Sequence, residues 1–256
     1  MEITFWGLFF GALLLLVPVY AMYAFCPGMT RKVAVAAVRM VVGMAVTGLC
    51  LYYLVVWDSV VLSVLFVLLM VVASSYVVVV EARIDLHLSF VPVFVGMFVA
   101  VAVVTAYLLL LVVVSGLPLG PRVIVPVSGL LAGMTVRAES RALSAYYDGL
   151  RNHSQMYYYL TANGATKAEA LRYLLCRALK KTAMAYVPDM SVMAVAVCPV
   201  AMWSMMLCGV SVLTAAAAQV VFVVASFCTT VLSVLLCVVL SRRFSFDRYG
   251  SVRDHA

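Results

Sequence analysis

The chain has 256 residues, of which 67% are hydrophobic and only 11% are charged, and its mean hydropathy is +1.17. Because soluble globular domains carry about a quarter charged residues, this composition excludes a water-soluble domain and favours an integral membrane protein. The formal net charge of +7 needs no nucleic-acid partner, since a basic cytoplasmic face beside anionic lipid headgroups accounts for it.

Seven apolar segments follow one another along the chain, and each is long enough to cross a hydrocarbon core of about 30 Å as a helix. They cover residues 3–25, 33–57, 60–80, 88–114, 123–142, 183–208 and 212–240. The runs are continuously apolar rather than alternating, which excludes a transmembrane β-barrel. The sequence therefore predicts an all-α, polytopic integral membrane protein with seven transmembrane helices in a single domain, 1–256.

The basic residues predict the orientation of these helices, because lysines and arginines near span ends stay on the cytoplasmic side. With seven crossings, sixteen of the seventeen Lys and Arg residues fall on one side and Arg122 alone on the other. We expect the N-terminus outside and the C-terminus, with a short basic tail at 241–256, in the cytoplasm. The first segment has no positively charged start, so it is interpreted as a retained anchor and not a signal peptide.

The one long polar stretch, residues 143–182, is the candidate cytoplasmic segment. Asn163, Gly164 and Ala165 predict a tight turn, since Asn and Gly tolerate positive φ. Thr166 and Glu169 have the spacing of a capping box, which predicts that a helix begins there. Its apolar stripe and basic residues predict an amphipathic helix on the membrane surface. The tyrosines at 157–159 fit an interfacial aromatic belt or an elbow that docks another protein.

A resemblance rests on these residues. The chain is similar to FetB-type ABC transporter permeases at residues 160–166 and at Pro199, Met202, Gly209 and Gln219. The separations between Gly164, Pro199, Gly209 and Gln219 match those of the family with no insertion or deletion. Further similarity occurs at Arg39 and at residues 126–133. This family includes bacterial iron-export permeases and plant aluminium-tolerance proteins. The chain departs from the family at 200–201, at 211–212 and at Met134, so the resemblance is closer for architecture than for cargo.

The resemblance implies the permease subunit of an ABC exporter in the bacterial inner membrane, with a metal ion such as iron as cargo. Asn163, Gly164, Ala165, Thr166 and Glu169 would then contact an ATPase. The chain has no phosphate-binding loop of the G-x-x-x-x-G-K-[ST] type, so a separate subunit would bind ATP and Mg and this chain no cofactor. One coupling segment per chain predicts a permease homodimer within the bilayer.

Polar groups and kinks within the spans are the candidates for a translocation pathway. The residues selected are Arg39, Asp189, Pro199, Met202, Met206 and Gln219. Arg137 and Arg141 could reach the inner headgroups, pair with Glu139 or another span, or line a vestibule for anions. The methionines and cysteines of the sixth span fit either an adaptable core or ligands for a soft metal ion.

Two other functions stay open at this stage. The cargo could be a nucleotide sugar or another small anion, or the chain could be a non-transporting scaffold whose cytoplasmic segment recruits a partner. No H-E-x-x-H or G-x-S-x-G motif occurs in the sequence, so we do not expect an enzyme.

Overall fold

The computed structural model describes residues 20, 23, 27–114, 120–152, 155, 159, 160, 162–164, 167–193 and 199–241. Among these residues the regular structure is helical, without a β-strand. The helices are α3 (Pro27–Trp57), α4 (Val60–Ala82), α5 (Leu86–Val114), α6 (Pro121–Asn152), α8 (Lys167–Ser191), α9 (Val200–Leu207) and α10 (Val212–Ser241). They divide into two compact units, Met1–Ser59 and Val60–Ala256.

Five of the described helices are long and apolar enough to cross a membrane. These stretches are Arg31–Trp57, Val60–Ala82, Ser89–Leu110, Pro121–Arg151 and Val212–Ser241. They confirm the second, third, fourth, fifth and seventh predicted segments as apolar helices. The first predicted segment, 3–25, lies outside the described residues apart from Tyr20 and Tyr23.

The first unit is described mainly through α3. Pro27 opens this helix, where its missing N–H costs no hydrogen bond, and Asp58 at φ 42° follows its end. Its side chains are largely exposed within the unit, including Arg39. A long apolar helix with exposed side chains is suited to contact with lipid.

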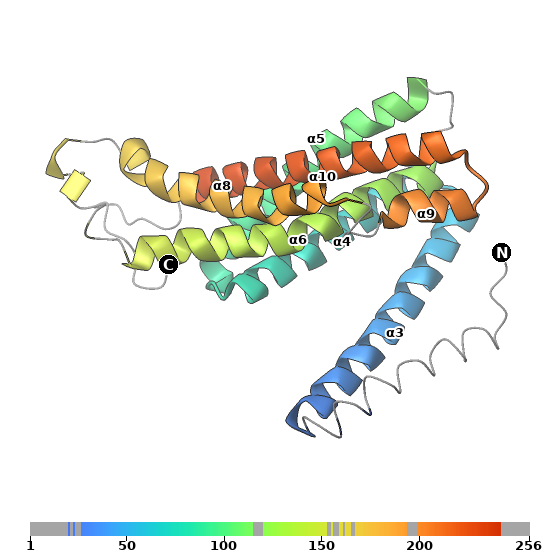
Figure 1. Cartoon of the computed structure of the whole chain (residues 1–256), viewed down its shortest axis with the longest axis horizontal. Helices are drawn as coiled ribbons and strands as arrows, with labels where there is room; N and C mark the ends of the chain where they lie inside the picture. The colour runs from blue at the N-terminus through green and yellow to red at the C-terminus, as the bar shows by residue number, and fades with distance from the viewer. Residues whose placement is uncertain are drawn as a thin grey trace. The chain divides into compact units, whose positions relative to one another are not determined.

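In the second unit, α5, α6, α8 and α10 run along a common direction, and α9 lies beside the start of α10 (Figure 1). The two faces of α5 show why these helices associate. Val91, Val95, Val99 and Val103 form an exposed stripe with a spacing of one helical turn, suited to acyl chains. The opposite face of α5, including Val93, Met97 and Val101, is buried.

Small residues let α10 pack closely on its neighbours. Its buried face carries Ser226, Thr230, Ser233, Cys237 and Ser241. A Cβ atom built on Gly96 of α5 would be 2.9 Å from the backbone nitrogen of Cys237 and 3.1 Å from the carbonyl oxygen of Ser233. The two backbones therefore touch at Gly96, which is the arrangement that small residues permit between membrane helices.

The sixth predicted segment, 183–208, is not one helix. The described residues form α8, which ends at Ser191, and a separate α9 that begins at Val200 with Pro199 as its N-cap. Pro188 lies in the last turn of α8. A proline supplies no N–H and disfavours helical backbone at the residue before it, so the two prolines account for the interruption.

The amphipathic helix expected on the membrane surface packs instead against the bundle. α8 begins at Lys167, close to the expected start, but its Leu171, Leu174 and Ala178 are buried in one cluster with Leu143 and Tyr146 of α6. The apolar stripe that predicted contact with lipid is thus covered by protein.

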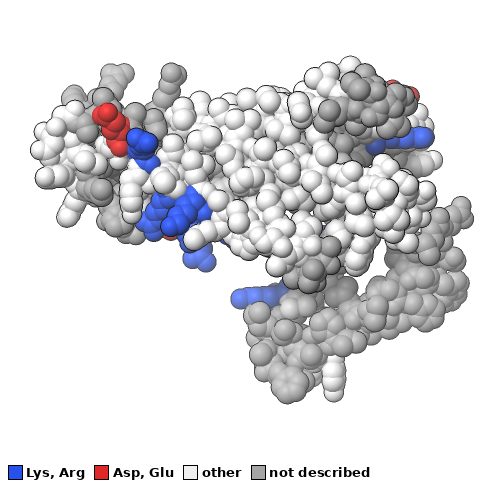
Figure 2. Space-filling model, turned by 45° about the horizontal axis from the view of Figure 1, so that its top comes forward, with Lys and Arg blue, Asp and Glu red and all other residues white. Residues whose placement is uncertain are grey.

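The charged side chains of the second unit are unevenly distributed. On α6, fourteen uncharged residues separate Arg122 from Arg137, and charges then recur through Arg151. On the face drawn in Figure 2, basic side chains gather toward the end of the bundle where α8 begins, others lie at the opposite end, and a broad uncharged surface separates the two ends. This uncharged surface fits the hydrocarbon region and the basic end fits a headgroup layer.

Candidate functional site

Gln219 connects three separate pieces of the chain. Its Oε1 accepts a hydrogen bond of 3.1 Å from the backbone N–H of Met202, and its Nε2 lies 3.9 Å from the sulfur of Met193. Met202 is in the first turn of α9, where backbone N–H groups have no partner within the helix. Gln219 of α10 therefore caps α9 and also contacts the segment that follows α8, as expected for an amide that bonds across helices.

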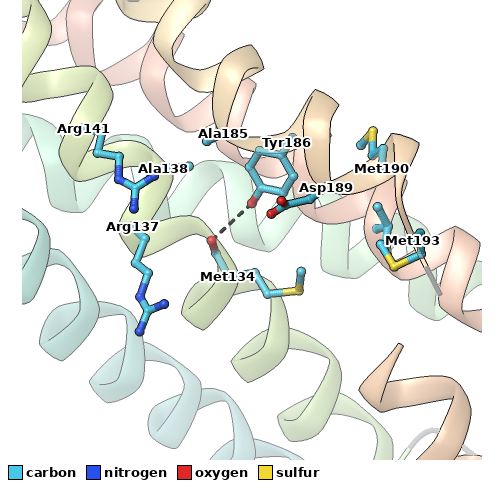
Figure 3. Close-up of a pocket in the computed structure, with 10 residues that line it drawn as sticks. Met134, Arg137, Ala138, Arg141, Ala185, Tyr186, Asp189, Met190 and Met193 are labelled. Carbon is cyan, nitrogen blue, oxygen red and sulfur yellow. Dashed lines mark hydrogen bonds between the residues drawn. The ribbon is translucent and has the colours of Figure 1, made fainter. Parts of the chain in front are cut away.

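An open cavity of about 240 Å³ lies between α6 and α8. From α6 it is lined by Met134, Arg137 and Arg141, and from α8 by Tyr186 and Asp189. In Figure 3 the two arginines extend in the same direction from α6, one turn apart, while Tyr186 and Asp189 reach toward α6 from α8. The cavity thus presents cationic, anionic and phenolic groups within the bundle.

Tyr186 is fixed in place by two hydrogen bonds. Its hydroxyl donates to the carbonyl oxygen of Met134 at 3.2 Å and lies 2.9 Å from Oγ1 of Thr230. One phenol therefore links α8 to both α6 and α10. Sequence reasoning did not select Tyr186, because a tyrosine in an apolar segment gives no signal beyond interfacial packing.

The charged groups of this cavity are not paired with one another. No acidic group of the described residues lies within ion-pair distance of Arg137 or Arg141, and Asp189 has no basic partner there. All three side chains are exposed to the opening. Of the alternatives for the arginines, pairing with Glu139 is wrong, because Glu139 turns away toward α10.

A second cavity of about 230 Å³ adjoins the first and shares Met190, Met193 and Val223 with it. Its polar lining residue is Gln219. Two predicted pathway residues, Asp189 and Gln219, thus line neighbouring spaces joined by methionines. At the start of α9, Gln219 contacts Met202, which also belongs to the predicted set. Pro199, another member of that set, is the N-cap of the same helix.

The remaining predicted pathway residues are not brought into this arrangement. Arg39 is an exposed residue of α3 in the first unit, whereas both cavities belong to the second. Met206 is 38% exposed near the end of α9 and lines neither cavity. Among the described residues, no group of three or more His, Cys, Asp or Glu side chains is arranged to hold a metal ion.

Glu139 is a polar group that sequence reasoning treated only as a partner for arginines. It is fully buried. Ser233 of α10 donates a hydrogen bond of 2.7 Å to its Oε1, and Oε2 has no hydrogen-bond partner in the described part of the chain. An acidic residue in an apolar predicted span was the available signal, since such residues are functional candidates by default.

The predicted cytoplasmic turn is present at Gly164. Its φ is +87°, a left-handed value that favours glycine. Nδ2 of Asn163 donates a hydrogen bond of 2.8 Å to the carbonyl oxygen of Tyr159, four residues earlier. This bond ties the residue directly before Gly164 to the preceding turn of the chain. Glu169 is exposed in the first turn of α8, whereas Ala165 and Thr166 lie outside the described residues, so the expected capping box is not tested.

The long apolar helices and the polar cavities between them define a multi-pass membrane protein with candidate binding spaces inside its helical bundle. The chain matches the family described as "Uncharacterised protein family (UPF0014)" over residues 5–246. It therefore belongs to this family, whose members are membrane proteins like the permeases of ABC transporters. No curated protein and no solved structure matches the chain significantly.

Proposed function

We propose that the chain is the membrane subunit of an ATP-binding-cassette exporter, with its pathway between α6, α8 and α10. The observation that carries this proposal is the pair of adjoining cavities, which share Met190, Met193 and Val223 and are lined by Asp189 in the first and Gln219 in the second. Polar and ionisable groups inside a bundle of membrane-spanning helices are costly and are typical of solute pathways. The membership of a permease-like family supports the same function.

The ATPase is proposed to be a separate subunit that binds ATP and Mg and docks at the turn around Gly164. The exposed turn at Asn163 and Gly164, immediately before α8, supports this assignment. A push on the turn would pass into α8, which carries Tyr186 and Asp189. A permease homodimer in the cell membrane, with the C-terminus in the cytoplasm, completes the proposed assembly.

The cargo suggested by the family resemblance is a metal ion such as iron. One specific observation favours a second candidate, a small anion. Arg137 and Arg141 line the cavity without an acidic partner among the described residues, and an unpaired cation within a membrane protein is stabilised by a bound anion. Both candidates use the same pathway, so one transport assay can compare them.

The proposed function is tested by purifying the chain together with an ATP-binding-cassette ATPase that associates with it and reconstituting both in vesicles. We expect ATP-dependent movement of a metal ion or of an anion. The substitution Gly164→Val should abolish ATPase association, because a β-branched residue is strained at φ +87°. Gly164→Asn is the matched control and should retain association, since Asn tolerates this conformation.

Two results together would reject the transporter proposal. They are stable ATPase binding by Gly164→Val and no ATP-dependent movement of any tested solute. Stable capture of a different soluble protein by the full chain would then favour the scaffold.

A further inference from the structure

A second charged space, distinct from the proposed pathway cavities, lies between α4, α6 and α8. This crevice, of about 390 Å³, is lined by Arg141, Arg177 and Lys181 and by Glu81 and Asp148. Only Arg141 also lines the cavity beside Asp189. Three basic and two acidic side chains leave the crevice with a net charge of +1.

The basic side chains of the crevice are not neutralised by its carboxylates. No ion pair joins Arg141, Arg177 or Lys181 to an acidic group of the described residues. Asp148 instead accepts a hydrogen bond of 3.3 Å from Ser144. Five charged groups thus share one space without direct pairing, which leaves the donors of the arginines and lysine available to a ligand.

Arg177 of α8 lies beside α6 at Gly149. A Cβ atom built on Gly149 would be 2.7 Å from Cδ2 of Leu174, whereas it would be at ordinary van der Waals distance from Arg177, 3.6 Å from Nη1 and 3.9 Å from Cδ. The two helices therefore pack closely at this glycine, and the arginine side chain lies along the surface of α6 there. Arg177 and Lys181 are four residues apart on α8, so they lie on the same face of the helix.

The crevice lies where the hydrocarbon region should end. Glu81 is in the last turn of α4, and the apolar stretch of that helix ends at Ala82. Basic pockets between membrane helices at this level bind phosphate-bearing headgroups. A single phosphodiester, with a charge of −1, would balance the net charge of the crevice.

We propose that this crevice binds a phosphate group, held by Arg141, Arg177 and Lys181. The group could belong to an anionic glycerophospholipid or to free phosphate, since both present the same oxygen atoms to these side chains. Hydroxyl groups of a phosphoglycerol head would be placed to donate to Glu81 and Asp148. The proposal does not depend on the identity of the transported cargo.

The test measures lipid binding to the full-length chain in detergent by native mass spectrometry, with phosphatidylglycerol, phosphatidylcholine and inorganic phosphate as separate probes. The variant carries Arg177→Gln and Lys181→Gln. The matched control carries Arg172→Gln and Lys180→Gln, which remove the same charges from exposed positions of α8 outside the crevice.

We expect phosphatidylglycerol to bind more tightly than phosphatidylcholine. At roughly 5-fold per basic side chain, the crevice variant should bind phosphatidylglycerol roughly 25-fold more weakly, and the control variant should bind it as the unmodified chain does. Competition by inorganic phosphate for the same side chains, without a preference for phosphatidylglycerol, would identify free phosphate as the source.

The proposal is overturned if the crevice and control variants lose the same affinity for every probe, or if none of the probes binds. A second measurement uses the unmodified chain, so the proposal can be tested even if the variants fail to fold. In the unmodified chain, the preference for phosphatidylglycerol or the binding of phosphate should weaken as sodium chloride is raised. Binding that is insensitive to salt would also reject a charge-based site.

Discussion

Ser233 of α10 and Glu139 of α6 are joined by a hydrogen bond of 2.7 Å between two fully buried side chains. This contact holds together two helices that both border the proposed pathway. It also leaves Oε2 of Glu139 without a partner in the described part of the chain. A glutamine side chain has nearly the same shape as this carboxyl group, and its amide oxygen can accept the same hydrogen bond.

We therefore expect Glu139→Gln to fold normally, because the amide keeps the acceptor for Ser233 and carries no charge. Ser233→Ala removes the donor and should lower the free energy of unfolding by about 1 kcal/mol. Ser191→Ala, at an exposed serine that bonds only within its own helix, is the control. Thermal unfolding in detergent measures all three. A large loss of stability in Glu139→Gln would show that the charged form is required.

The backbone contact at Gly96 predicts that alanine is tolerated less well at Gly96 than at Gly133. In Gly96→Ala the new methyl group would meet backbone atoms of α10 at 2.9 and 3.1 Å, and a helix backbone cannot move aside as a side chain can. We expect a loss of about 1 to 3 kcal/mol in stability. Gly133→Ala should not destabilise the protein and should gain up to about 1 kcal/mol from helix propensity, because nothing lies within 4 Å of its added atom.

Equal melting temperatures for the two alanine variants would contradict this prediction. Such a result would mean that α5 and α10 can separate by a few tenths of an ångström without cost. The comparison uses the same substitution in two helical glycines, so differences in helix propensity do not confuse it.

Removing the hydrogen bond between Gln219 and Met202 should loosen α9 locally and leave the rest of the bundle ordered. The change Gln219→Leu keeps a similar volume but leaves the N–H of Met202 without its acceptor. We expect the amides of α9, Val200–Leu207, to exchange with deuterium roughly 5-fold faster or more. Exchange in the α5 and α6 helices should not change. Val220→Ala, at the adjacent exposed position, is the control, and uniform acceleration across the chain would reject a capping role.

The cavity arginines provide a test of cargo that depends on the proposed function. Arg137→Gln should reduce ATP-dependent transport of an anion by roughly 10-fold or more, because it removes a charged hydrogen-bond donor from the pathway. Transport of a metal cation should not fall. Arg122→Gln, at the opposite end of α6, is the control for charge. Unchanged anion transport would exclude Arg137 from the pathway.

The sequence predicted the apolar helices well because twenty or more consecutive apolar residues have one stable form in lipid. The turn at Gly164 was also predictable, since Asn followed by Gly is a local signal. Both inferences depend only on neighbouring residues. The interruption of the sixth segment was less accessible. Pro199 predicted a kink, but the hydrogen bond from Met202 in the first turn of α9 to Gln219 joins residues that are distant in sequence.

The site residues divide in the same way. Asp189 and Gln219 were found because polar residues stand out in apolar segments. Tyr186 and Thr230 were missed because they matter through a hydrogen bond between α8 and α10. The spacing of residues along the sequence does not show that these two side chains meet. The amphipathic stripe of α8 was detected but assigned to lipid, since the pattern alone does not distinguish a lipid surface from the face of α6.

The backbone contact at Gly96 also limits how this molecule can change shape. Two helices that touch backbone to backbone cannot slide or tilt past one another without breaking that fit, so α5 and α10 should move as one rigid body. Any widening of the cavity beside Asp189 then has to come from α6 or α8, the other two helices that line it. In a transport cycle the pair of α5 and α10 would be the fixed frame, and α6 and α8 would be the parts that move.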